Sequence, residues 1–198
     1  MATVPMQHIE NEEAWRLPSK GRVGMACLIV AETAVFTIFV VAYLYYLGRD
    51  QYGPTPRQVL ELPILSTICL LSSSLFIWLA ERAIEHGNMQ RFTLWWGVTF
   101  LLGAIFLFAT GLEWHKLIVH DHLTVRTNLF GTTFYSLVGL HATHVIIGLL
   151  FLLVVLMLSM QGKVKQHHSE RVQVLALYWH FVDAIWVVVF TVVYVVGR

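Results

Sequence analysis

Five long stretches of mostly apolar residues constrain the fold of this chain more than any other feature of its sequence. A helix needs about 20 consecutive apolar residues to cross the hydrocarbon core of a bilayer, whereas the strands of a membrane β-barrel are about 10 residues long and alternate in polarity. The sequence therefore predicts an all-α integral membrane bundle of five transmembrane helices in residues 22–198, behind a polar N-terminal segment of residues 1–21. The predicted spans are residues 23–47, 62–83, 94–115, 129–160 and 174–196.

Composition supports a membrane protein, because 57% of the residues are hydrophobic, 13% are charged and the mean hydropathy is +0.67. A soluble domain of ordinary composition is about one quarter charged. The net charge of +1 gives no reason to propose a nucleic acid as a partner. Residues 1–21 hold no apolar core of a cleavable signal peptide, so we expect the first helix to direct its own insertion.

Lysine and arginine are unevenly distributed between the two sides of the predicted bundle. Cytoplasmic loops carry an excess of these residues, and the bias favours a cytoplasmic N-terminus and a periplasmic or external C-terminus. The inner segments would then hold Arg16, Lys20, Arg22, Arg82, Arg91, Lys163, Lys165 and Arg171, and the outer ones Arg49, Arg57, Lys116, Arg126 and Arg198.

Five ionisable side chains lie deep inside the predicted spans, where they are costly and therefore indicate a functional site. At about 1.5 Å per residue, Glu32 lies roughly 15 Å along the first helix, and His141 and His144 lie deep in the fourth. Residues three apart share a helix face, so the two histidines point one way, and His180 and Asp183 share a face of the fifth helix. A glutamate at this depth must find a partner, most naturally His141 or His144, or stay protonated.

The histidines raise the question of a metal or haem site. A haem b held by two imidazoles needs histidines on facing helices, and His141 or His144 with His180 could supply one such pair. The connection that holds His115, His120, Asp121 and His122 offers ligands suited to zinc or copper. We favour structural or lipid-contacting roles for the former and a solvated loop for the latter, and so expect no metal site. No nucleotide-binding, HExxH or nucleophile-elbow motif occurs in the chain.

One segment carries a family resemblance. YWHFVDAIWVVVF (residues 178–190) resembles the signature of the last helix in subunit III of the haem–copper oxidases. Four further matches follow the family's order: RVGM with AET around Glu32, LPILSTICLLSSSLFIW, LLGAIFLFATGLEW and GTTFYSLVGLHATHVIIG. Together they cover about residues 20–197 and are similar to the short five-helix bacterial form. Ser66 and Ala142 stand where the family pattern has Asn and Gly.

The resemblance implies a non-catalytic subunit of a respiratory cytochrome c oxidase in the bacterial cytoplasmic membrane, with haem and copper carried by partner subunits. It implies docking on catalytic subunit I beside subunit II, phospholipid held in a cleft between helices, and support of proton uptake. Arg22 would bind a lipid phosphate, because its guanidinium presents a fork of donors. His180 and Asp183, with Trp179 of the same motif, would form the polar floor of the cleft, and Glu32, His141 and His144 would lie beside it.

Several alternatives stay open at this point. The partner complex could be a quinol oxidase or a relative of nitric oxide reductase instead of a cytochrome c oxidase. The same side chains could make hydrogen bonds between helices without any lipid. A different class, a five-helix b-type cytochrome, would require haem in this chain.

Overall fold

The structure is a computed structural model that describes residues 19–49, 55–60 and 62–197. Nearly all of the predicted N-terminal segment 1–21 therefore lies outside the described residues. Within them every regular element is helical, and five helices are long and apolar enough to cross a membrane. The predicted fold class, an all-α membrane bundle, is confirmed.

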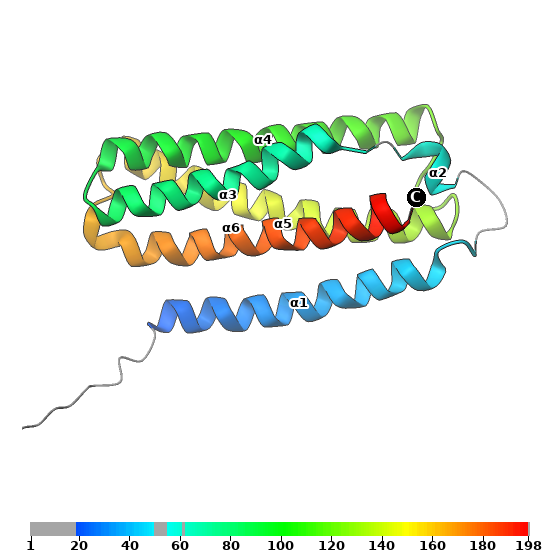
Figure 1. Ribbon diagram of the computed structural model, residues 1–198, viewed down its shortest axis with the longest axis horizontal. Coiled ribbons are helices and arrows are strands. Elements are labelled where there is room, and N and C mark those ends of the chain that lie inside the picture. The colour runs from blue at the N-terminus through cyan, green and yellow to red at the C-terminus, as the bar shows by residue number, and fades with distance from the viewer. Residues whose placement is uncertain (1–18, 50–54, 61, 198) are drawn as a thin grey trace, which may run out of the picture.

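The long helices follow one another in antiparallel order (Figure 1). Helix α4 begins at Met89 and ends at Val119, so it is longer than the predicted span of residues 94–115. The last helix begins at Ser169 and finishes in six residues of π-helix. The elements are α1 (Lys20–Tyr46), a short α2 (Pro56–Val59), α3 (Ile64–Glu85), α4 (Met89–Val119), α5 (Leu129–Met160), the 3-10 turn η1 (Gln166–His168), α6 (Ser169–Phe190) and its π-helical end η2 (Thr191–Val196).

Local sequence signals explain where the helices start and stop. Asn88 and Asn128 cap α4 and α5, each accepting a hydrogen bond from the backbone N–H three residues later, at 3.1 and 2.8 Å. Gly87 and Gly162 lie two residues past the last residues of α3 and α5, and their φ angles of 72° and 69° fall in the left-handed region that glycine adopts at low cost. These stops produce the tight connections that let neighbouring helices pack antiparallel.

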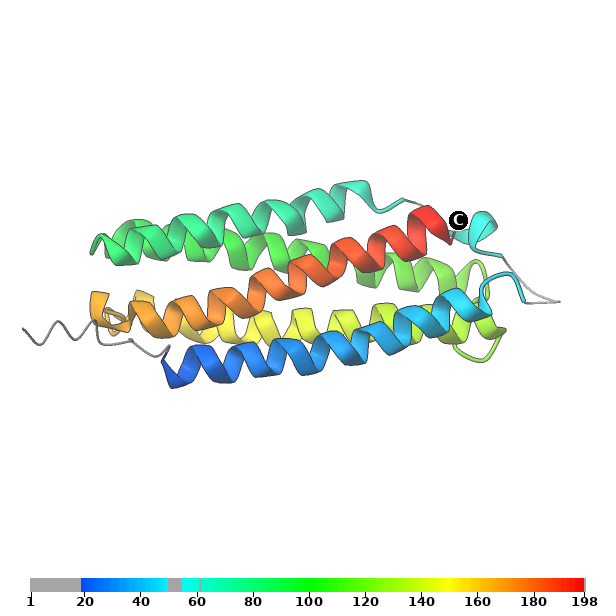
Figure 2. The same ribbon diagram turned by 60° about the horizontal axis from the view of Figure 1, so that its bottom comes forward.

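Helix α1 lies to one side of the bundle (Figures 1 and 2). It packs on α5 and α6 and makes no comparable contact with α3 or α4 among the described residues, whereas α3 packs on both α4 and α6. The bundle therefore consists of a four-helix group, α3 to α6, with α1 laid against one flank.

The interior is filled by aromatic rings, and the exterior is apolar as well. Trp96, Trp179 and Trp186 are almost completely buried. On the outside, Val30, Leu65 and Phe108 expose 71%, 78% and 69% of their surface. A helix that is apolar all round suits lipid on one side and protein on the other, so the exposed surface confirms a membrane protein.

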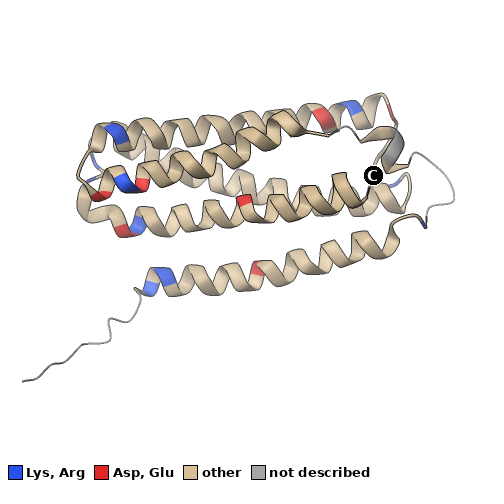
Figure 3. Cartoon of the chain, viewed as in Figure 1, with Lys and Arg blue, Asp and Glu red and all other residues tan. Residues whose placement is uncertain are grey.

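Charged residues gather toward the two ends of the bundle (Figure 3). By position in the chain, Glu32 lies near the middle of α1, and Asp183 near the middle of α6 and its continuation η2. The end at which α1, α4 and α6 begin holds basic side chains together with Glu81 and Glu85 at the end of α3. We call this the amino-terminal end of the bundle. Two polar layers thus flank an apolar zone interrupted by two carboxylates.

Candidate functional site

Asp183 of α6 is held by Ser74 of α3 in the middle of the bundle. The Ser74 hydroxyl donates to Asp183 Oδ2, and His180 Nδ1 lies 3.1 Å from the same hydroxyl oxygen. Because the hydroxyl has one proton and gives it to Asp183, the arrangement requires His180 Nδ1–H to donate to Ser74. Asp183 is only 3% exposed, and its Oδ1 has no partner among the described residues. We call Ser74, His180 and Asp183 the Asp183 cluster.

Trp179 joins three helices beside this cluster. Its indole N–H donates to Ser73 Oγ of α3 at 2.8 Å, and Ser73 in turn donates to the carbonyl of Leu70. The indole ring lies against Gly103 of α4 and Gly148 of α5. A Cβ atom at either glycine would come within 2.7–2.8 Å of the ring, so only glycine leaves room for it. Trp179 is therefore a packing centre and does not line an open site.

A groove opens beside the cluster, toward the amino-terminal end, between α1, α3 and α6. Its volume is about 570 Å³, and Arg22 and His180 both line it. Arg22 donates to Gln173, which donates to Glu85 at 2.6 Å, so the guanidinium is tethered to α6 and α3. We call this the Arg22 groove; its lining residues are Arg22, Val23, Ala26, Cys27, Glu81, Gln173, Leu177 and His180.

Glu32 of α1 pairs with His144 of α5 at a separate point. His144 Nδ1 lies 2.8 Å from the carbonyl of Leu140, and Nε2 lies 3.3 Å from Glu32 Oε2. A carbonyl only accepts, so Nδ1 carries a proton, and a neutral ring then has an acceptor at Nε2. A hydrogen bond to Glu32 therefore needs one further proton, carried by either the carboxyl or the imidazole. The side chains of Glu32 and His144 are 29% and 10% exposed.

His141 is buried elsewhere, in the aromatic core. Only 1% of its surface is exposed, its ring lies 4.9 Å from that of Trp186, and Phe106 meets it edge-on at 6.0 Å. Neither ring nitrogen has a hydrogen-bond partner among the described residues. Its surroundings are those of a core side chain.

The residues singled out from the sequence thus fall into three places. Arg22 and His180 meet at the Arg22 groove, and Asp183 lies directly behind it through Ser74. Glu32 pairs with His144, and His141 lies in the core. None of these positions tests the roles expected of the residues, so lipid binding stays a prediction.

Sequence reasoning missed the polar partners on α3 and α6. Ser73 and Ser74 hold Trp179 and Asp183, while Glu81 and Gln173 line the groove. One signal was available, because three successive serines at 72–74 interrupt an otherwise apolar span. Within the described ranges, no three side chains of His, Cys, Asp or Glu gather as a metal site requires.

Comparison with known proteins identifies the family. The family described as cytochrome c oxidase subunit III matches residues 16–198. Cytochrome c oxidase subunit 3 of Bacillus sp. (strain PS3) is 34% identical over 88% of this chain and 84% of its own length, and that of Synechocystis sp. is 37% identical over 86% and 73%. Cytochrome bo(3) ubiquinol oxidase subunit 3 of Pseudomonas aeruginosa is 34% identical over 88% and 84%.

These matches cover nearly all of the described helices, including the Asp183 cluster, the Arg22 groove and the Glu32–His144 pair. Their names place the relatives in membrane oxidase complexes, which agrees with the five apolar helices found here. The chain is a subunit III of the haem–copper oxidases and belongs to the cytochrome c oxidase subunit III family.

Proposed function

We propose that the chain is the non-catalytic subunit III of a proton-pumping respiratory cytochrome c oxidase, bound to catalytic subunit I and to subunit II. The family description and the names of the Bacillus and Synechocystis relatives support cytochrome c as the electron donor of the complex. The bacterial relatives support a location in a bacterial cytoplasmic membrane. The basic residues at the amino-terminal end (Figure 3) support an orientation with that end inside.

A quinol oxidase is the second candidate, because the Pseudomonas relative of equal identity is named as a subunit of one. The purified complex decides between them. A cytochrome c oxidase oxidises reduced cytochrome c and leaves a ubiquinol analogue untouched, whereas the reverse result assigns the chain to a quinol oxidase.

The redox chemistry, in this proposal, belongs to haem and copper in partner subunits. Axial ligation of haem needs a free imidazole nitrogen on each of two facing histidines. His144 uses both ring nitrogens within the protein, and the unbonded nitrogens of His141 are enclosed in the aromatic core against Phe106 and Trp186. The full-length chain purified alone should therefore show no haem band in a reduced-minus-oxidised spectrum. Stoichiometric iron in that preparation would overturn the proposal and favour a five-helix b-type cytochrome.

The Arg22 groove is the observation that supports a phospholipid site. It joins a tethered guanidinium to apolar walls from Val23, Ala26 and Leu177. Arginine recognises phosphate through paired donors, and the walls suit an acyl chain that enters from the bilayer. A lipid seated there would also fill the space between α1 and α3, which do not pack on each other. We propose that this lipid stabilises the subunit against subunit I and supports lasting proton uptake.

Replacement of one side chain tests the lipid site. Arg22→Ala should reduce the phospholipid that stays bound to the full-length chain in native mass spectrometry by about tenfold, the equivalent of one charge-assisted contact. Lys20→Ala is the matched control, because Lys20 is an exposed cation two residues away that does not line the groove. Equal lipid retention by both variants would make Arg22 a simple topology signal.

A further inference from the structure

A chain of polar side chains leads from the Arg22 groove to the centre of the bundle. Glu81 and His180 both line the groove, and Glu81 Oε2 lies 3.8 Å from His180 Nε2. The other imidazole nitrogen lies 3.1 Å from the Ser74 hydroxyl, which donates to Asp183. The side chains of His180 and Glu81 are 36% and 19% exposed, whereas Asp183 is 3% exposed. The chain therefore connects a surface groove to an enclosed carboxyl group.

Each link of this chain can receive a proton and release one. A hydroxyl is both a donor and an acceptor, and an imidazole carries a proton on either nitrogen or on both. A proton that binds His180 Nε2 produces an imidazolium, whose Nδ1 proton passes to Ser74 while the Ser74 hydroxyl proton passes to Asp183 Oδ2. The imidazole is then neutral again with its proton on Nε2, Ser74 keeps one proton, and Asp183 is a neutral acid.

The transfer reverses the direction of two hydrogen bonds without moving a heavy atom. Before it, His180 Nδ1–H donates to Ser74 and Ser74 donates to Asp183; afterwards Asp183 donates to Ser74 and Ser74 donates to Nδ1, over the same contacts. One proton has entered from the groove and one is bound at Asp183. The rigid helices α3 and α6 therefore present no obstacle to the exchange.

The charged groups around His180 come from three helices. Glu81 of α3 lies at the entry to the chain, and Glu85 lies one turn nearer the end of the bundle. Arg22 of α1 lines the same groove and is bonded to Gln173 of α6. The histidines of α5 lie elsewhere, because His144 faces Glu32 and His141 lies in the aromatic core. Glu81 is therefore the carboxylate placed to collect a proton for His180.

We propose that Asp183 is a proton-binding site that exchanges its proton with the Arg22 groove through Ser74 and His180. A buried carboxylate is costly unless it is paired or neutralised, and this chain supplies the neutralising proton. Chains of ionisable side chains inside membrane helices are characteristic of proton relays. The site depends neither on a lipid in the groove nor on the electron donor of the complex.

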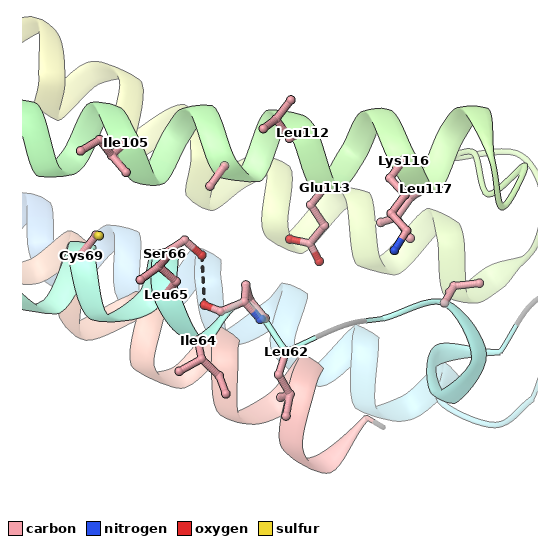
Figure 4. A pocket seen from close by; sticks show the side chains of 13 residues that line it. Leu62, Ile64, Leu65, Ser66, Cys69, Ile105, Leu112, Glu113, Lys116 and Leu117 are labelled. Atoms are coloured by element: carbon pink, nitrogen blue, oxygen red, sulfur yellow. Dashed lines mark hydrogen bonds between the residues drawn. The ribbon is translucent and has the colours of Figure 1, made fainter.

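A second serine of α3 provides a contrast. Helix α4 extends beyond the start of α3, and Ser66 lines a pocket there together with Glu113 (Figure 4). The Ser66 hydroxyl donates to the backbone carbonyl of Pro63 at 3.0 Å, and a carbonyl has no proton to exchange. Ser66 is therefore a matched control, a buried serine on the same helix that joins no proton chain.

Infrared difference spectroscopy of the full-length chain in lipid nanodiscs tests the site. The pH is lowered from about 8 to about 5, the range in which histidine changes charge. The C=O stretching band of a protonated carboxylic acid should develop in the wild type. Asp183→Asn should remove the part of that band that belongs to Asp183, while the bands of other carboxyl groups remain.

Release of a caged proton by a light flash then measures how fast the proton reaches Asp183. Ser74→Ala should slow the rise of the band by about a hundredfold, because a positioned proton-transfer group contributes about that much. Ser74→Thr keeps a hydroxyl and should restore the rate. Glu81→Gln should slow the rise by about tenfold through loss of local proton attraction. Ser66→Ala and Glu170→Gln, which alters an exposed carboxylate at the start of α6, should leave the rate unchanged.

His180→Gln tests the same step if loss of the Ser74 hydroxyl destabilises the chain. The amide of glutamine can still donate to Ser74 but does not titrate, so the rise should again be about a hundredfold slower.

Three results would overturn the proposal. A spectrum without a pH-dependent band that Asp183→Asn removes would show that Asp183 binds no exchangeable proton. Wild-type rates in both Ser74→Ala and His180→Gln would show that the proton arrives by another route. An equal delay in Ser66→Ala would assign the effect to helix α3 as a whole.

Discussion

Two of the polar contacts between helices, the Asp183 cluster and the Glu32–His144 pair, differ in depth and in the number of bonds. The Asp183 cluster joins α3 to α6 through a 3% exposed carboxylate, with the Trp179–Ser73 bond beside it. The Glu32–His144 pair joins α1 to α5 by one contact of 3.3 Å between partly exposed side chains. The four-helix group is therefore tied internally, whereas the described part of α1 is attached by the Glu32–His144 contact, by the Arg22–Gln173 bond near its start and by the packing of one face.

Burial follows the same division. In the most apolar stretch of α1 only 6% of the residues are buried, whereas 50% are buried in the most apolar stretch of the last helix. In a membrane, helix association rests on close packing and on hydrogen bonds between helices, and α1 has few of either. The comparison indicates that α1 is the helix most easily displaced and that the Arg22 groove, with one wall on α1, depends on its position.

Loss of Trp179 should produce the largest effect. Trp179→Ala removes the indole bond to Ser73 and empties the space between Gly103 and Gly148. Truncation of a fully buried tryptophan costs about 3–5 kcal/mol, so the thermal stability of the chain and its yield in assembled complex should fall sharply. Trp78→Ala is the control; this ring is 40% exposed and should cost about 1 kcal/mol or less. Similar losses for both would contradict the central role of Trp179.

Loss of the Ser74 hydroxyl should have the second largest effect on stability. Ser74→Ala deprives Asp183 of its hydroxyl partner while Oδ1 already has none among the described residues. An unsatisfied buried polar group costs roughly 1–3 kcal/mol. Unfolding in detergent by guanidinium chloride or by heat measures this loss of stability. Ser72→Ala is matched, since that hydroxyl donates only to the Cys69 carbonyl of its own helix. A Ser72 variant as unstable as the Ser74 variant would show that the serine run acts through helix α3 alone.

Glu32 should have the smallest effect on stability. Glu32→Ala breaks the Glu32–His144 contact between α1 and α5 and should cost about 1 kcal/mol, a common value for hydrogen bonds between membrane helices. Glu32→Gln keeps a hydrogen-bonding side chain and should be tolerated. Thr33→Ala is the control, because its hydroxyl donates only to Ile29 of the same helix. Retention of the subunit in the purified complex measures the effect.

The same two Glu32 variants separate structure from proton handling. A structural role predicts normal turnover of every complex that assembles, whichever residue replaces Glu32. A proton-handling role predicts that both variants assemble but that the complex loses activity sooner as the pH rises above neutral. Wild-type assembly, turnover and activity lifetime in both variants would refute both roles.

Much of the fold follows from the sequence alone, because membrane helices obey local rules. Length and hydrophobicity are sufficient to place five spans, and the asparagine caps and left-handed glycines that bound them are visible as single residues. The extra turns of α4 escaped prediction, since Gln90, Arg91 and Lys116 are polar residues typical of a connection between spans, although here they belong to the helix. The family resemblance likewise rests on short sequence motifs that occur in the family's order.

The arrangement of neighbours needed the tertiary structure. Helical periodicity predicts which residues share a face, but it does not say which helix that face meets. His141 and His144 lie three apart, yet one meets Trp186 of α6 and the other Glu32 of α1. The bonds from Ser73 and Ser74 to α6 join residues more than 100 positions apart. The sequence by itself determined five membrane helices and a family. Only tertiary packing decided that α1 lies against one flank of the other four helices and that α4 extends beyond the start of α3, because both depend on contacts between distant segments.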